Sequence, residues 1–349
     1  MRTLATLLLC LPALPMTAAA QQEPAGDAAT QGGFTVPLSH RGQRKWKLRL
    51  PDEQWTPVGV AFRFKRTQGH DFKAELEGTR LVVDTDGDGT GDVKAEGKAA
   101  FLTLRGRSAG GKPTAYSVRM VNRQGWRYAP GGFVAGKAQG TPIRIIDQNN
   151  NGRFDDVGKD ALIVGRGKVA TFLSEVVNLR GSLFRISVAA DGSELSAEPY
   201  QGPAGTLRLD CSTKGKVLSA VVRSTDHRYS FDGARAALGL AVPAGSYELY
   251  CGELGLGESR VKMLTGESRP FEVASAQTRK ICWGGPVRAE FDYQRQENKV
   301  HLSPKRVWYY GALGERYVDW VPLGASPQFT ITDDRTGKEV ARAFFPGTC

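Results

Sequence analysis

The amino-acid sequence predicts an all-β fold composed of antiparallel β-sandwich or barrel domains. Many short segments alternate apolar with polar residues, which is the pattern of a strand that buries one face. Glycine and proline, 42 and 18 in a chain of 349 residues, separate these segments at short intervals. No amphipathic segment longer than two helical turns occurs between them. Short strands with frequent turn signals are typical of antiparallel sandwiches and barrels.

The first residues predict export from the cell. Arg2, an apolar run from Leu4 to Leu14 and the small residues before position 21 have the layout of a signal peptide over residues 1–20, cleaved near Ala20. The mature protein is therefore expected to be secreted, periplasmic or held at the cell surface. Residues 21–33 have no apolar periodicity and predict a flexible leader. No segment reaches the roughly 20 apolar residues of a membrane-spanning helix, so we expect no transmembrane segment.

Two alternating, strongly basic segments follow the leader. KWKLRL places Trp46, Leu48 and Leu50 opposite basic residues, and VGVAFRFK, residues 58–65, has the same pattern. With a formal net charge of +11 for the chain, such a basic ladder would attract a polyanion such as cell-surface polysaccharide. We favour the simpler interpretation, the solvated face of two amphipathic strands, and predict no specific nucleic-acid partner. The basic residues are Arg41, Arg44, Lys45, Lys47, Arg49, Arg63, Lys65 and Arg66.

The next apolar segment, RLVV, runs directly into a cluster of aspartates. Asp84, Asp86 and Asp88 occupy every second position and are followed by Gly89 and then by Asp92. Like charges so close together repel, and the neighbouring glycines add conformational entropy that folding must remove. The cluster therefore predicts a bound counter-ion.

The same arrangement occurs a second time later in the chain. Aligning Asp147 with Asp84 (147 − 84 = 63 residues) puts Asn149, Asn151 and Asp155 at the positions of Asp86, Asp88 and Asp92. Both copies fit D-x-[DN]-x-[DN]-G-x-x-D, follow an apolar segment and lead into G-K-x-A. This is an internal repeat of strand, loop and strand. We define the first loop as residues 84–96 and the second loop as residues 147–160.

Both loops resemble the calcium-binding loops of EF-hands, dockerins and thrombospondin type 3 repeats. The resemblance implies that Ca²⁺ is the bound ion, because calcium takes about six to eight oxygen ligands around a loop whose sixth residue is glycine. In the first loop it implies side-chain ligands from Asp84, Asp86 and Asp88 and a carbonyl ligand from Thr90. In the second loop the corresponding residues are Asp147, Asn149, Asn151 and, through its carbonyl, Arg153.

The loops depart from the EF-hand pattern at the twelfth position, which holds Ala95 and Gly158 in place of a bidentate glutamate. Nearby acids are expected to replace it: Asp92 and Glu96 in the first loop, and Asp155, Asp156 and Asp160 in the second. Strands flank both loops, so we expect rigid structural sites of weak to moderate affinity and not a sensor that opens a helix pair. The alternative is a pair of acidic turns that bind no ion specifically.

The chain divides into three predicted β regions. Residues 34–200 contain both loops, residues 204–280 form a β-sandwich, and residues 281–349 form a C-terminal β-sandwich segment. The phrase VPAGSYELY, with Pro243 and Gly245 in its turn, resembles transthyretin-like and carboxypeptidase-regulatory-like modules. That resemblance implies a transthyretin-like or immunoglobulin-like sandwich. The alternating segments beyond the second loop are LFRISVA, TLRLDC, KVLSAVVR, GSYELYC, PVRAEFDY, QFTITD and EVARAFF.

Signal cleavage removes Cys10 and leaves an even number of cysteines. In an exported chain, Cys211, Cys251, Cys282 and Cys349 predict at least one disulfide, with free buried thiols as the alternative. Neither their spacing nor the four scattered histidines has the pattern of a zinc site. An aromatic run near the C-terminus is expected to form the core of the last sandwich, with stacking on sugar rings as the alternative. Its members are Trp308, Tyr309, Tyr310, Tyr317 and Trp320.

The sequence contains no nucleophile elbow, HExxH, P-loop or dinucleotide-binding motif. We therefore predict an exported calcium-binding protein with a structural or adhesive role at the cell surface or in a matrix. One alternative is a carbohydrate- or polyanion-binding module in which calcium is a scaffold ion. The other is a hydrolase, because the paired carboxylates of a glycosidase have no fixed spacing in the sequence.

Overall fold

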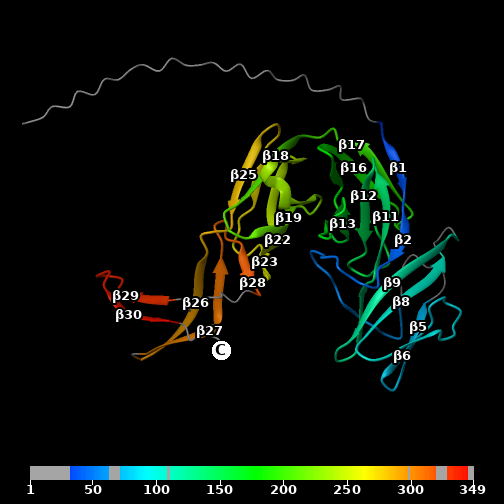
Figure 1. Cartoon of the computed structure of the whole chain (residues 1–349), viewed down its shortest axis with the longest axis horizontal. Coiled ribbons are helices and arrows are strands. Elements are labelled where there is room, and N and C mark those ends of the chain that lie inside the picture. Colours follow the sequence, from blue (N-terminus) through cyan, green and yellow to red (C-terminus); the bar gives the residue numbers. More distant parts are fainter. Residues whose placement is uncertain (1–31, 63–70, 108–110, 298, 320–327, 345–349) are drawn as a thin grey trace, which may run out of the picture. The chain divides into compact units, whose positions relative to one another are not determined.

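The alternating segments fold into β-strands, so the all-β prediction is confirmed (Figure 1). The computed structural model describes residues 32–62, 71–107, 111–297, 299–319 and 328–344. Within these ranges there is no α-helix, and one 3₁₀-helix, η1, spans Gly233–Leu238. None of the described helices is long and apolar enough to cross a membrane. The expected signal peptide and nearly all of the expected leader lie outside the described residues.

Two sheets pair the first two described strands with strands that come much later in the chain. One has the order β1-β17-β16-β15, which pairs β1 (Phe34–Pro37) antiparallel with β17 (Glu194–Pro199). Its other strands are β16 (Ser182–Val188) and β15 (Val176–Leu179). The second has the order β14-β13-β12-β11-β2. Its strands are β14 (Thr171–Phe172), β13 (Ala161–Val164), β12 (Thr141–Ile146), β11 (Gly132–Ala138) and β2 (Ser39–Gly42).

Two further sheets complete this region. One has the order β3-β10-β9-β8, from β3 (Thr56–Pro57), β10 (Trp126–Pro130), β9 (Pro113–Asn122) and β8 (Ala99–Arg107). The other has the order β4-β5-β6-β7, from β4 (Ala61–Phe62), β5 (Phe72–Glu77), β6 (Arg80–Val83) and β7 (Val93–Ala95). The inward-facing residues of all four sheets share one apolar core, which includes Phe62, Val83, Val118, Ile145 and Phe184.

The strands beyond residue 200 surround a second core that includes Leu209, Tyr247 and Trp283. A three-stranded sheet has the order β21-β18-β25, from β21 (Leu240–Pro243), β18 (Ala204–Cys211) and β25 (Thr278–Trp283). The pair β18 and β25 is parallel, unlike the predicted antiparallel pattern.

The largest sheet has the order β20-β19-β22-β23-β28-β27-β26, and β24 also pairs with β22. Its strands are β20 (Ser230–Asp232), β19 (Lys216–Ser224), β22 (Gly245–Leu256), β23 (Ser259–Leu264), β24 (Phe271–Val273), β26 (Arg288–Gln296), β27 (Lys299–Tyr310) and β28 (Arg316–Val318). Because β28 pairs with β23, strands after residue 281 continue the sheet of the preceding region. The strands β29 (Gln328–Thr332) and β30 (Glu339–Phe344) form the red hairpin of Figure 1.

The two basic segments form less regular structure than their alternation predicts. Leu48 is buried and Lys47 is exposed, as an amphipathic strand requires, yet the only bridge in KWKLRL joins Arg49 to Val169. In VGVAFRFK only β4 is a described strand, Val60 is 76% exposed, and residues 63–65 lie outside the described part. A strand needs a neighbour for its backbone groups along its whole length. In KWKLRL only Arg49 has such a bridge, and in the described part of VGVAFRFK the ladder to β5 covers only Ala61 and Phe62.

The predicted disulfide is not present, because Cys211, Cys251 and Cys282 are all free. Cys282 pairs in register with Asp210, so it points to the opposite face of the sheet from Cys211, which packs against the second core. Cys251 belongs to β22 of another sheet. Two thiols can join only when their side chains point toward one another, and this fold separates them. Cys349 lies outside the described residues.

The aromatic run near the C-terminus contributes to the second core. Tyr317 is a buried member of that core, and Tyr309 packs against it while partly exposed. Trp308 and Tyr310 are half-buried, and Trp320 lies outside the described residues. The two core members make packing the better account of this run than sugar stacking.

Candidate metal centre

The first loop begins where β6 leaves the apolar core. Alternation along β6 buries Leu81 and Val83, and the next residue, Asp84, is only 1% exposed. Its backbone N–H donates to the carbonyl of Lys73 at 3.0 Å, which holds the start of the loop against β5. The position of Asp84 is therefore fixed by the end of β6 and by its hydrogen bond to β5.

The backbone of the first loop folds around its own carboxylates. One oxygen of Asp84 accepts the amide of Gly87 at 2.6 Å, and the other accepts the amide of Gly89 at 2.8 Å. Asp86 Oδ1 accepts the amide of Asp88 at 3.1 Å, and Asp88 Oδ1 accepts the amide of Thr90 at 2.7 Å. These hydrogen bonds turn successive side chains toward the interior of the loop.

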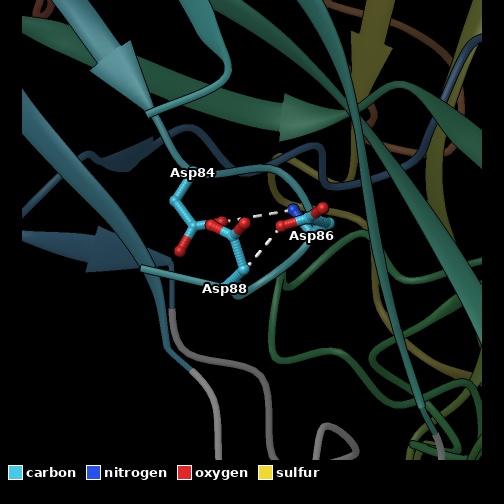
Figure 2. Close-up of side chains that lie close together, drawn as sticks. All are labelled: Asp84, Asp86 and Asp88. Carbon is cyan, nitrogen blue, oxygen red and sulfur yellow. Dashed lines mark hydrogen bonds between the residues drawn. The ribbon is translucent and has the colours of Figure 1, made fainter. Parts of the chain in front are cut away.

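Figure 2 shows the three aspartates gathered around one point. One oxygen of each carboxylate lies within 4.8 Å of the corresponding oxygens of the other two, a spacing that suits ligands of a single cation. Asp84 is buried, whereas Asp86 and Asp88 are exposed. The site is therefore buried on the side of Asp84 and open to solvent on the side of Asp86 and Asp88.

The second loop repeats three of these side-chain-to-backbone contacts, although Asp147 Oδ1 accepts the amide of the fifth residue, Asn151, where Asp84 Oδ1 accepts that of the fourth, Gly87. The first-position residue, Asp147, accepts the amide of Gly152 at the sixth position, at 2.6 Å. Asn149 Oδ1 accepts the amide of Asn151 at 3.2 Å, and Asn151 Oδ1 accepts the amide of Arg153 at 2.8 Å. The third-to-fifth and fifth-to-seventh contacts of the first loop are thus present here as well.

The two loops also share their backbone conformation. The fourth and sixth positions both have positive φ: 82° and 92° at Gly87 and Gly89, and 58° and 79° at Asn150 and Gly152. L-residues enter this region at a cost, which glycine avoids and asparagine tolerates best. The choice of Gly or Asn at these positions is therefore a requirement of the loop geometry.

The remaining predicted ligands of the first loop have other partners. Asp92 Oδ2 accepts both the amide and the hydroxyl of Thr85, at 2.7 and 2.8 Å. These hydrogen bonds hold the pKa of Asp92 below its usual range. Glu96 pairs with Arg80 at 2.9 Å, and both side chains are more than half exposed. Thr90 is exposed, and its amide belongs to the loop pattern described above.

In the second loop the acids beyond the sixth position form a network. Asp155 is bound by the guanidinium of Arg153, with Nε 2.9 Å from Oδ1. Asp156 accepts the amide groups of both Asn149, at 2.9 Å, and Asn151. Asp160 Oδ2 accepts the backbone N–H of Asp156 at 3.0 Å.

Asp160 is the one acid of this network that has a buried oxygen without a hydrogen-bond donor among the described residues. It is 0% exposed, and its Oδ1 has no hydrogen-bond donor among the described residues. Burial, together with the charge of Asp147, raises the pKa of the Asp160 carboxyl well above its usual range. An ionised carboxylate in such a place is costly unless a cation or a proton compensates it.

Two residues outside the repeat, Tyr116 and Gln54, contribute to the second loop, and no motif in the sequence marks them. The hydroxyl of Tyr116 on β9 donates to Asp147 Oδ2 at 2.9 Å. Asn150, at the fourth position, donates to the carbonyl of Gln54 at 3.0 Å and ties the loop to an earlier segment. The only available signal was that Tyr116 occupies an inward position in an alternating strand.

Two of the five described basic residues of the predicted ladder have other partners. Arg41, Arg44, Lys45, Lys47 and Arg49 are exposed. Arg44 lies over the ring of Phe101, 5.5 Å from its centroid, and Arg49 pairs with Glu253 at 2.9 Å. Arg63, Lys65 and Arg66 lie outside the described residues.

Among the described residues, only Asp84, Asp86 and Asp88 form a group of three acidic, histidine or cysteine side chains close enough to share one cation, and the acids of the second loop are not gathered in this way. Carboxylate oxygens suit a hard cation, and Asn149 and Asn151 of the second loop offer side-chain oxygens of the same class. Comparison with protein-family models, with curated proteins and with solved structures gave no match. What can be said about function therefore starts from the chemistry of these two loops.

Proposed function

We propose that this protein is an exported calcium-binding protein in which Ca²⁺ holds the first β region together. The observation that carries the proposal is the geometry common to both loops. Each has a buried first-position aspartate, the same three side-chain-to-backbone contacts, and the same two left-handed residues. A loop of this shape directs several oxygens toward one point, which is the requirement of a cation site.

Calcium fits these loops better than its common competitors. Magnesium needs a near-ideal octahedron at about 2.0–2.1 Å, whereas calcium accepts irregular sets of oxygens at about 2.3–2.6 Å. Zinc is bound mainly by thiolates and imidazoles, and neither loop contains cysteine or histidine. Irregular sets of oxygen ligands without thiolate or imidazole therefore favour Ca²⁺.

The proposed role of the ion is structural. The first loop joins β6 to β7, and the second joins β12 to β13, and both are antiparallel pairs within the sheets. Without a cation the aspartates of the first loop repel one another. Calcium would relieve that repulsion and fix the connection between paired strands, with no helix pair to open.

The size of the effect follows from linkage between binding and folding. A dissociation constant on the order of 0.1 mM is close to the range of extracellular calcium modules. At about 1 mM free calcium, binding then stabilises the folded state by roughly 1.4 kcal/mol per site. For a domain of this size that corresponds to a rise in melting temperature of about 3–6 °C per site.

Thermal melts in calcium and in chelator, together with isothermal titration calorimetry, test the proposal. The wild-type protein should melt higher in calcium, and Asp84→Ala combined with Asp147→Ala should abolish most of the difference. Asp333→Ala is the matched control, because Asp333 caps a turn outside both loops with the same kind of side-chain-to-amide contact. A melt that chelator leaves unchanged, with no heat of binding at millimolar calcium, would contradict the proposal.

The adhesive role and the carbohydrate- or polyanion-binding alternative remain predictions. A glycan array separates them from a purely structural role, because a structural protein should show no saturable binding. A substrate screen does the same for the hydrolase alternative.

A further inference from the structure

We infer that Asp160 completes the cation site of the second loop, and that the two sites are consequently unequal, with the second loop filling before the first. This inference rests on the proposed calcium binding and names the ligand that the EF-hand pattern leaves unassigned. The ligand class is a divalent oxygen-binding cation of the size of Ca²⁺. The first loop, in contrast, has no comparable closing carboxylate.

The twelfth position of the second loop has no room for a ligand. Gly158 has a φ of 73°, and a Cβ added there would lie 2.6 Å from the carbonyl oxygen of His227. No real Cβ tolerates such a contact, so a glutamate at this position is excluded by the fold. The closing carboxylate must therefore come from another residue.

The chain beyond Gly158 folds back and returns Asp160 to the loop. The backbone N–H of Asp160 donates to the carbonyl of Asp156 at 2.9 Å, while Asp156 N–H donates to Asp160 Oδ2 at 3.0 Å. Leu173 N–H donates to the carbonyl of Asp160 at 2.6 Å and fixes it from the other side. The fourteenth residue of the loop thus takes the place that the twelfth has in an EF-hand.

The unpartnered oxygen of Asp160 is the independent sign of a ligand. Asp160 is completely buried, and its Oδ1 has no donor among the described residues. The other acids of the second loop have donors: Asp147 from Tyr116 and Gly152, and Asp156 from two asparagines. A buried carboxylate oxygen without a donor needs a cation or a proton to compensate its charge, and a cation in the loop would be that partner.

The first loop has no equivalent residue. Its twelfth residue is Ala95, Asp92 is exposed and accepts from Thr85 through Oδ2, and Glu96 is an exposed partner of Arg80. Its cation would be held by Asp84 and by two exposed aspartates whose water must be displaced. Fewer and more exposed ligands give weaker binding, so this site fills second.

Calorimetric titration with calcium tests the assignment through Asp160→Asn, which keeps the shape of the side chain and removes its charge. The wild type should show two binding events, and the variant should lose at least about tenfold in affinity at the tighter one. Glu315→Gln is the matched control, because Glu315 is equally buried but has donors from Gly284, Leu313 and Tyr317. This control should retain both events. Retention of both wild-type affinities by Asp160→Asn would overturn the inference.

Melting temperatures show whether Asp160→Asn simply fails to fold well. In chelator the variant should melt at or above the wild type, because the wild type then buries a carboxyl group that no cation compensates. In calcium it should melt below the wild type, because it has lost a ligand. Glu315→Gln should melt lower in both conditions. If Asp160→Asn lowers the melting temperature equally in calcium and in chelator, Asp160 is an ordinary structural residue.

Terbium luminescence tests the order of filling. Tb³⁺ replaces Ca²⁺ in oxygen sites, and the phenol of Tyr116, bound directly to Asp147, should sensitise emission from the second loop. Emission excited through tyrosine should saturate with the first equivalent of Tb³⁺ and should decrease in Tyr116→Phe. Emission that rises only with the second equivalent would overturn the proposed order. Absence of any calcium binding by the wild type would instead contradict the proposed function itself.

Discussion

At the scale of single residues, the same side chain has different tasks in the two loops. Asp84 and Asp147 are both buried and both organise the backbone around them. Asp92 and Asp155 occupy equivalent positions in the repeat, yet Asp92 accepts from Thr85 and Asp155 pairs with Arg153. Equal spacing in the sequence therefore does not give equal roles, because each carboxylate binds whichever donor the local fold brings to it.

Tyr116→Phe is expected to destabilise the protein, because it removes the hydroxyl that donates to Asp147. Hydrogen bonds to buried charged groups contribute about 1.5–3 kcal/mol, so the free energy of unfolding should fall by that amount. The loss should be larger in chelator than in calcium, because the ion also compensates Asp147. Urea unfolding curves in both conditions measure this. An equal loss in the two conditions would show that Tyr116 acts on packing alone.

The free cysteines should differ sharply in reactivity. Burial raises the pKa of Cys251 to about 12, so its thiol stays protonated and unreactive in the native state at pH 8. Cys282 is exposed and should be alkylated quickly. Mass spectrometry after brief labelling of native, unreduced protein should find Cys282 modified and Cys251 intact. After denaturation without reductant, Cys211, Cys251 and Cys282 should all react. If fewer than these three react, the protein contains a disulfide after all.

The same shift gives a dependence of stability on pH. The thiol of Cys251 has a folded-state pKa above its unfolded-state value, so its contribution is complete below about pH 9 and is lost as the pH rises toward about 12.

At the scale of secondary-structure elements, the loops depend on the strands that carry them. The repeat of strand, loop and strand presents each first-position aspartate at the end of a buried strand, β6 or β12. The strands come from separate sheets, with β6 between β5 and β7 and β12 between β11 and β13. A local sequence unit thus gives the same loop in two different sheet environments, since its geometry is set by its own hydrogen bonds.

Gly158→Ala should reveal how tightly the second loop is packed. Its φ is positive, and the new Cβ would lie 2.6 Å from the carbonyl oxygen of His227. Gly165→Ala is the matched control, with a φ of 90° and open space around its Cβ. The control should cost about 1–2 kcal/mol for the left-handed backbone alone, and Gly158→Ala should cost clearly more. Equal losses in chemical denaturation would mean that His227 moves aside without cost.

At the scale of the whole described molecule, the second loop lies next to the start of the second core. Leu173 is hydrogen-bonded to both Gly158 and Asp160, and the residues that follow it contact the turn before β20. Ser174 Oγ accepts the amide of Ser230 at 3.1 Å, and Glu175 pairs with Arg228 at 2.7 Å. A cation in the second loop therefore has a short path of hydrogen bonds to strands of the other core.

Calcium should accordingly slow amide hydrogen exchange beyond the loops. We expect slower exchange at residues 171–176 and 224–230, because their hydrogen bonds are anchored through Leu173. The hairpin of β29 and β30 should exchange at the same rate with and without calcium, because it pairs only with itself among the described strands. Protection limited to residues 84–96 and 147–160 would show that the ion acts locally.

The sequence by itself determined the all-β fold, most of the strands and the two loops. Period-two alternation and turn residues act over a few neighbours, and the segments LFRISVA and KVLSAVVR are strands as that alternation predicts. The convergence of Asp84, Asp86 and Asp88 follows equally from local spacing and glycine conformation.

Only the tertiary structure decided which groups meet across long separations. It excludes a side chain at Gly158, buries Asp160 without a donor among the described residues and brings Tyr116 to Asp147. It also separates Cys211 from Cys282 and leaves KWKLRL without a continuous partner. These outcomes depend on the faces and neighbours that distant strands acquire when sheets pack, and local periodicity carries no information about them.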